Sequence, residues 1–214
     1  MLSSPSGGGK STIARHLLEA REDVTYSVSA TTRPLRPGET NGTHYHFLDR
    51  PEFERRVAAG EFIEWAEYGG NLYGTLRKEI EKGLTAGKHV VLDIEVAGAR
   101  QVRERFPNSV HVFVLPPSAG ILAERLRGRN TEEPAAVARR MAIAADELLA
   151  AREYEYVVVN DDVVDAVAHV AAILDGEGRK VRRLTNLDAV IEDLRRDLAG
   201  RQLRLRGPDT PMKE

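Results

Sequence analysis

Short apolar runs alternate along the chain with stretches in which apolar residues recur at every third or fourth position. The apolar runs lie at residues 89–94, 110–115 and 156–159. Short continuous runs of this kind indicate strands that are buried on both faces. The helical spacing between them predicts amphipathic helices, whose apolar stripes are formed by Ile13, Leu17 and Leu18, by Val137, Met141, Ala144, Ala145 and Leu148, and by Val163, Val167, Val170 and Leu174. Strands that alternate with helices are typical of an α/β fold with a parallel sheet and flanking helices.

Two segments depart from this alternation. Residues 29–80 are rich in Thr, Gly, Tyr and Arg and carry several turn signals, which indicates a small mixed α+β insertion. Residues 125–140 contain a cluster of arginines, a composition that suits a helical lid. We predict a core formed by residues 1–28 and 84–174, an insertion at 29–83, a lid at about 124–141, and a partly helical tail at 175–214 to which the sequence assigns no function.

The composition excludes several classes of protein. The 214 residues include no cysteine, which removes a disulfide scaffold, a cysteine-based metal site and a thiol nucleophile. The net charge is −2, with 31 basic against 33 acidic residues, so the chain lacks the positive excess of a nucleic-acid binder. Neither a signal peptide nor an apolar run long enough to cross a membrane is found. We expect a cytoplasmic protein with no nucleic-acid or membrane partner.

A glycine-rich loop precedes the first predicted helix. Residues 4–12 read S-P-S-G-G-G-K-S-T, which departs from the phosphate-loop pattern G-x-x-x-x-G-K-[ST] only by Ser4 in place of glycine. Backbone N–H groups of such a loop and the helix N-terminus bind phosphate oxygens. Lys10 is expected to reach the β- and γ-phosphates of ATP, and the Ser11 hydroxyl to bind Mg²⁺. The candidate ATP-binding residues are Ser6, Gly7, Gly8, Gly9, Lys10, Ser11 and Thr12.

Asp93 supports this site from another part of the chain. It follows the apolar residues 90–92, near the carboxyl end of a predicted buried strand. Open α/β sheets place ligand-binding groups at this edge, and a carboxylate here typically holds Mg²⁺ through water. The loop and Asp93 together predict a protein that binds a nucleoside triphosphate with Mg²⁺ as cofactor.

Only three residues precede the loop, which is too few for the strand that normally leads into it. Two explanations stay open. Either the sheet lacks most of that strand, or the recorded start of the chain lies downstream of the true one.

The insertion carries residues suited to a second nucleotide. Two arginines and two tyrosines can donate hydrogen bonds to a phosphate dianion. Guanine presents two N–H donors and one carbonyl acceptor, which a carboxylate and a hydroxyl can answer; the insertion supplies Ser29, Glu64 and Thr75. Trp65, next to Glu64, is expected to be a core residue. The relevant segments read S-A-T-T-R-P-L-R-P-G-E at 29–39, N-G-T-H-Y-H-F at 41–47, F-I-E-W at 62–65 and Y-G-T at 73–75.

This combination resembles the guanylate kinase family, and the resemblance covers about residues 2–174. It implies that Arg33, Arg36, Tyr45 and Tyr73 bind the GMP phosphate, and that Ser29, Glu64 and Thr75 contact guanine. It also implies that Arg125, Arg129 and Arg140 close over the transferring group beside Lys10, and that Asn160 lies near the adenine of ATP. Glu95 stands where the family has an aspartate that contacts guanine, so its carboxylate reaches one methylene further.

The reaction that the resemblance implies is ATP + GMP (or dGMP) to ADP + GDP, with these nucleotides as partners and a chain that works as a monomer or homodimer. The GMP phosphate attacks in line, without a covalent intermediate or a general base. One alternative is a nucleoside monophosphate kinase for another base, against which Glu64 and Thr75 argue. The other is a guanylate-kinase-like binding module without catalysis, against which the intact Lys10, Ser11 and Asp93 argue.

Overall fold

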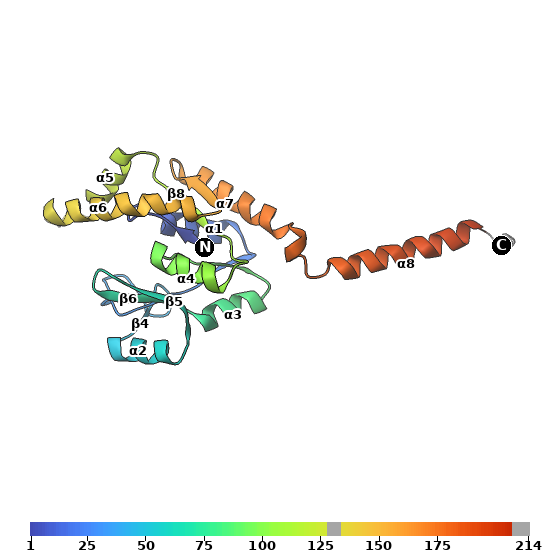
Figure 1. Ribbon diagram of the computed structural model, residues 1–214, viewed down its shortest axis with the longest axis horizontal. Coiled ribbons are helices and arrows are strands. Elements are labelled where there is room, and N and C mark those ends of the chain that lie inside the picture. Colours follow the sequence, from blue (N-terminus) through green and yellow to red (C-terminus); the bar gives the residue numbers. More distant parts are fainter. Residues whose placement is uncertain (128–133, 207–214) are drawn as a thin grey trace. The chain divides into compact units, whose positions relative to one another are not determined.

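The computed structural model describes residues 1–127 and 134–206 (Figure 1). Its central strands run parallel in two groups: β1 (Leu2–Ser3), β8 (Val112–Leu115) and β9 (Tyr156–Val159) in the order β1-β8-β9, and β2 (Val24–Tyr26) beside β7 (His89–Val91). Two backbone hydrogen bonds connect the groups: Leu2 N donates to Leu92 O at 2.8 Å, and Ile94 N donates to Leu2 O at 3.2 Å. The parallel sheet that the apolar runs predict is confirmed.

Helices connect the parallel strands, as such a sheet requires. These helices are α1 (Lys10–Ala20), α3 (Arg77–Thr85), α4 (Val96–Arg105), α5 (Ala119–Arg127) and α6 (Pro134–Leu149) with the 3-10 turn η1 (Ala150–Glu153). Helix α7 (Val163–Gly178) follows the last strand, β9. Helix α1 buries Ile13, Ala14 and Leu17, so two of its three predicted stripe residues face the core. Asp93, two residues after β7, forms a parallel bridge with Leu2 of β1 and a hydrogen bond with Ser11 of α1, so the carboxyl end of β7 meets the start of α1.

A second sheet is inserted between β2 and β7. Its strand order is β4 (His46–Phe47), β3 (Ala30–Thr31), β6 (Asn71–Leu76), β5 (Phe62–Tyr68), and only the β3–β4 pair is parallel. Helix α2 (Arg50–Ala58) covers it, and Figure 1 shows α2 on the side of this sheet away from α4. The Phe53 and Phe62 rings stack with centroids 4.4 Å apart in the core of this region.

Strand β5 contains a bulge between Phe62 and Glu64. Phe62, Ile63 and Glu64 are consequently all buried, although a regular strand would expose alternate residues. Phe62 packs in the core of the second sheet and Ile63 packs with Leu92 and other residues of the central core. Our expectation that Trp65 is a core residue is wrong: 39% of it is exposed, because the bulge changes the alternation before it reaches this position.

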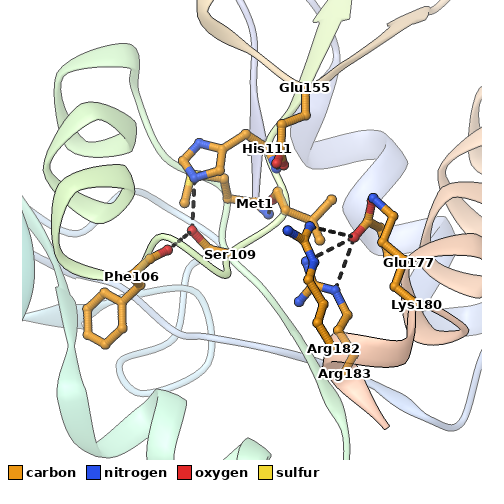
Figure 2. Close-up of polar contacts among 10 residues, drawn as sticks. Met1, Phe106, Ser109, His111, Glu155, Glu177, Lys180, Arg182 and Arg183 are labelled. Carbon is orange, nitrogen blue, oxygen red and sulfur yellow. Dashed lines mark hydrogen bonds and ion pairs between the residues drawn. The ribbon is translucent and has the colours of Figure 1, made fainter.

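The chain divides into two compact units, Met1–Ala171 and Ala172–Glu214. In the second unit, the end of α7 (Val163–Gly178) is followed by the 3-10 turn η2 (Val181–Arg183) and by helix α8 (Leu187–Arg206). The buried Glu177 carboxylate forms ion pairs with Lys180 and, at 2.9 Å, with Arg183 (Figure 2). These contacts fix the turn after α7. Among the described residues, no helix has the length and apolar character that crossing a bilayer requires.

Candidate nucleotide-binding site

The glycine-rich loop turns tightly between β1 and α1. Gly7 and Gly9 have φ angles of 83° and 93°, in the left-handed region that favours glycine, and Gly9 is the N-cap of α1. Gly8 N donates to Pro5 O at 2.9 Å, and a Cβ atom on Gly8 would lie 2.6 Å from the Ser4 Cβ. Every described residue with positive φ is a glycine, so Ser4 fits the loop without backbone strain. Its hydroxyl donates to Pro5 O at 2.9 Å.

Asn160 fastens this loop to the end of β9. Its side-chain Nδ2 donates to Gly8 O at 2.9 Å, and a Cβ atom on Gly9 would lie only 2.2 Å from the same nitrogen. Arg125 Nη2 donates to Asn160 O at 3.4 Å. The other terminal nitrogen of Arg125, Nη1, is buried and has no hydrogen-bond acceptor among the described residues. The structure therefore brings Arg125 and Asn160 to the loop, with the Asn160 amide on the loop backbone.

Lys10, the first residue of α1, lies between two carboxylates. Its Nζ is 3.1 Å from Glu95 Oε1 and 3.6 Å from Asp93 Oδ1. Burial opposes the charge of Lys10, but the two carboxylates outweigh it and raise the Lys10 pKa above its ordinary value. The ammonium is therefore protonated at physiological pH. Glu95, which the family resemblance assigns to guanine, contacts Lys10 in this structure.

Ser11 and Asp93, the candidate ligands of Mg²⁺, contact each other directly. The Ser11 hydroxyl donates to Asp93 Oδ2. A hydroxyl and a carboxylate are hard oxygen donors of the kind that Mg²⁺ prefers, so this pair fits that ion. Within residues 1–127 and 134–206, no group of three or more His, Asp or Glu side chains is placed to hold a metal. An ion here would therefore complete its coordination with phosphate and water, as Mg²⁺ does with nucleotides.

Helix α6 reaches the loop at Ser6. Ser6 N donates to Glu147 Oε2 at 3.0 Å, and Arg140 Nη2 lies 3.4 Å from Ser6 Oγ. Burial raises the pKa of Glu147. Arg140 was a candidate from the sequence, whereas Glu147 was not, because an acidic residue on a charged helix gives no local signal. Arg129, the third candidate of the lid, lies outside the described residues.

Glu64 and Thr75 form a buried pair in the second sheet. They face each other across β5 and β6, and Thr75 Oγ1 donates to Glu64 Oε1 at 2.6 Å. Only 4% of Glu64 is exposed, and this burial raises its pKa to about 7, although the Thr75 hydroxyl favours the charged form. The register that pairs Ala30 with Gly74 places Ser29, also buried, next to Thr75. Glu64 and Thr75 thus lie on neighbouring strands, and Ser29 directly precedes the next strand, β3.

The candidate phosphate-binding residues of the insertion gather around Arg33. Its guanidinium makes two hydrogen bonds to the Glu39 carboxylate, at 2.7 and 3.0 Å, and lies 5.5 Å from the centre of the Tyr45 ring. The Tyr45 and Tyr73 rings are 6.1 Å apart. Arg36 is exposed and joins the group through its backbone N, which donates to Glu39 Oε2 at 2.8 Å.

The two groups of residues lie close enough to act on each other electrostatically. Burial raises the pKa of Tyr45, and the negative charge of Asp93 raises it further. Glu95 likewise adds to the raised pKa of Glu64. The residues around Lys10 and those of the insertion therefore converge on one region.

A parallel α/β sheet whose first strand leads through a Gly-Lys-Ser loop into a helix defines a P-loop nucleotide-binding protein, here with an inserted sheet beside the loop. The family model described as guanylate kinase matches residues 1–177. The chain belongs to the guanylate kinase family, whose members are nucleoside monophosphate kinases.

Individual relatives agree with this assignment. A guanylate kinase of Symbiobacterium thermophilum is 50% identical over 194 residues, which is 91% of both chains. A guanylate kinase of Sphingopyxis alaskensis is 48% identical over 199 residues, which is 92% of this chain and 90% of the relative. The crystal structure of guanylate kinase from Anaplasma phagocytophilum superposes with a TM-score of 0.74 at 37% identity, covering 90% of this chain and 92% of that one.

Proposed function

We propose that the chain transfers the γ-phosphoryl group of ATP to GMP, and to dGMP, giving ADP and GDP in a Mg²⁺-dependent reaction. The observation that carries the proposal is the buried Glu64–Thr75 pair beside the phosphate loop, since an ionised carboxylate accepts both N–H groups on the Watson–Crick edge of guanine. Adenine presents an acceptor at the corresponding ring nitrogen, which a carboxylate repels. The pair therefore favours guanine.

The donor nucleotide binds along the loop. The N–H groups at the start of α1 and the Lys10 ammonium bind the β- and γ-phosphates of ATP. Ser11 and Asp93 would hold the Mg²⁺, which would supply positive charge against that of the phosphates. The buried Nη1 of Arg125, for which the part of the chain that the structure describes supplies no acceptor, is a donor available to the transferring group.

The acceptor nucleotide binds in the insertion. Arg33, Arg36, Tyr45 and Tyr73 bind the GMP phosphate, and its oxygen attacks the γ-phosphorus in line. That oxygen is already ionised near neutral pH, so catalysis consists of positioning and charge neutralisation. Glu39 holds the Arg33 guanidinium in place until the phosphate arrives. We infer that the protein works in the cytoplasm, which the cysteine-free chain fits, as a monomer or homodimer.

The reaction is tested by a coupled assay of ADP release with Mg-ATP and each of GMP, dGMP, AMP, CMP and UMP. We expect turnover with GMP and dGMP and at most traces with the others. Turnover with another base would keep the kinase and reject the roles of Glu64 and Thr75. If the folded protein shows neither turnover nor ATP binding in a fluorescence titration, the binding-module alternative gains support, because such a module lacks a working phosphate loop.

Replacing Gly9 by alanine tests the donor site. The new Cβ atom would collide with Asn160 Nδ2 at 2.2 Å, and the φ of 93° disfavours any side chain. We expect the Kd of Mg-ATP, measured by calorimetry, to rise about tenfold or more, which corresponds to roughly 1.4 kcal/mol, while the GMP Kd stays within about twofold. Gly60→Ala is the matched control, because Gly60 has a φ of 69° but no atom within 4 Å of the added Cβ. Equal ATP affinity in both variants would contradict the role of the loop.

A further inference from the structure

Gly98 lies in the first turn of α4, directly against the Glu64 carboxylate. A Cβ atom built on Gly98 would lie 2.3 Å from Glu64 Oε2 and 2.9 Å from Glu64 Cδ. Both residues are buried. No side chain, not even a methyl group, fits between this helix and Glu64 in its present position.

Helix α4 is held against β5 and cannot move away to make room. Gln101 Nε2 donates to Trp65 O at 2.6 Å, and Trp65 N donates back to Gln101 Oε1 at 3.3 Å. One turn further, Arg105 Nη1 donates to Ile63 O at 2.7 Å. These bonds attach the helix to the strand backbone on both sides of Glu64. The spacing between α4 and β5 is therefore fixed, and only the free end of the Glu64 side chain can move.

Glu64 is confined on its other side by β6. Thr75 Oγ1 donates to Glu64 Oε1 at 2.6 Å, so one carboxylate oxygen is held by Thr75 and the other faces Gly98. The carboxylate thus occupies a slot with two defined walls. The Thr75 hydroxyl limits the position of the carboxylate on one side, and the α4 backbone at Gly98 limits it on the other.

We infer that Gly98 is a positioning residue that sets the place of the Glu64 carboxylate and thereby the selectivity of the site for guanine. The inference rests on the proposed function and adds to it a determinant of specificity that does not touch the base. The three atoms nearest to the Cβ position at 98 all belong to Glu64. A substitution there acts on the base-binding carboxylate and leaves the loop, Lys10 and Asp93 in place.

Gly98→Ala is the first test. The added methyl group displaces the Glu64 carboxylate toward the guanine position, while alanine favours the helix more than glycine does. We expect KM for GMP to rise about tenfold or more and KM for ATP to change by less than about twofold, with a smaller GMP-over-AMP preference in kcat/KM. Calorimetric titration with GMP alone should show the same loss of affinity, independently of turnover.

A second variant separates positioning from general disturbance of the structure. Glu64→Asp shortens the carboxylate by one methylene, which makes room for a Cβ atom at position 98. Alone, Glu64→Asp should raise KM for GMP because the carboxylate falls short of the base. In the double variant Gly98→Ala/Glu64→Asp, KM for GMP should be lower than in Gly98→Ala, since the clash is gone. Such a rescue is the non-additive behaviour expected of two groups in contact.

Gly120→Ala on α5 is the matched control. Gly120 is a helical glycine whose added Cβ would be 3.7 Å from Ser118 Oγ, an ordinary contact distance, so we expect wild-type KM values. The inference is overturned if Gly98→Ala keeps the wild-type KM for GMP, or if the double variant is no better than Gly98→Ala. If Gly98→Ala does not fold, the double variant is compared with Glu64→Asp alone. A higher KM for GMP in the double variant than in Glu64→Asp then also overturns the inference. Absence of GMP turnover in the wild type would instead reject the proposed function.

Discussion

The Lys10→Ala variant is expected to lose most of its turnover while it still binds GMP. The ammonium contacts Asp93 and Glu95 at 3.6 and 3.1 Å, and its raised pKa keeps it protonated at physiological pH. Removing such a fixed positive group from a phosphoryl-transfer site lowers kcat by about 100- to 1,000-fold. Glu64, Thr75 and Arg33, which we propose bind GMP, lie on other elements, so the Kd of GMP should stay within about twofold.

Two further variants make this result specific. Lys88→Ala removes an exposed lysine from the turn before β7 and should leave kcat unchanged. Lys10→Met keeps the length of the side chain without its charge and should be as inactive as Lys10→Ala, because the charge and not the volume is needed. Wild-type kcat in Lys10→Ala, with ADP release measured at saturating Mg-ATP, would refute the role assigned to this residue.

The Glu64→Gln variant should lose its discrimination between GMP and AMP. In the proposed complex the carboxylate accepts hydrogen bonds from guanine, whereas the amide of the variant would present its own N–H₂ group toward the same donors. A site left with mismatched buried groups loses about 2–4 kcal/mol of selectivity, or roughly 30- to 1,000-fold in the ratio of kcat/KM. The assay compares kcat/KM for GMP and AMP in both proteins. An unchanged ratio would show that Glu64 does not contact the base.

The titration of Glu64 leads us to expect that KM for GMP depends on pH. The Glu64 pKa is raised to about 7 by burial, so the wild type at pH 6 holds mostly the neutral acid, which cannot accept both guanine N–H groups. KM for GMP should fall as the pH rises from about 6 to 8. Glu64→Gln should remove this trend. KM for ATP, measured over the same pH range, serves as the reference. A wild-type KM for GMP that stays constant across this range would contradict the role assigned to Glu64.

The stability of the folded chain should fall over the same pH range in which its affinity for GMP rises. A carboxyl group whose pKa is higher in the folded chain destabilises the fold progressively as the pH rises from its ordinary value of 4.5 to about 7. Without nucleotide, Glu64→Gln should therefore be more stable than the wild type at pH 8, by an amount on the order of 3 kcal/mol at most, and nearly equal to it at pH 4. Urea unfolding at the two pH values measures the difference. A variant that is less stable at pH 8 would indicate that the carboxylate is stabilised by contacts other than Thr75.

The periodicity of apolar residues and the local motifs predict the core strands and the conformation of the phosphate loop well. The run at 156–159 is β9 residue for residue, and the run at 110–115 contains β8. Gly7 and Gly9 stand at the two positions of the loop where φ is positive, so the glycine pattern reports backbone conformation directly. Ser29, Glu64 and Thr75 could be grouped because the family resemblance links them, and the strand register places them side by side.

Contacts between distant segments could not be predicted in this way. The bulge before Glu64 reverses the alternation of buried and exposed side chains along β5 and exposes Trp65. No residue type at 62–64 indicates that a bulge occurs there. Glu147 reaches Ser6 N across 141 positions of the chain. Gly98 has an ordinary helical conformation, so its need for glycine comes from a neighbour in space and not from its own φ. Such features depend on packing, which a single sequence does not display.

Three hydrogen-bond donors of the site share one property that bears on how ligands enter and leave. Lys10 contacts Glu95, Arg33 contacts Glu39, and the Ser6 N–H contacts Glu147, so each donor already has a carboxylate of the chain as its acceptor. A phosphate that binds here exchanges one anion for another, and its departure restores the internal pair. The net gain for each contact is therefore small, which favours ligands with several charges over single inorganic anions and speeds product release.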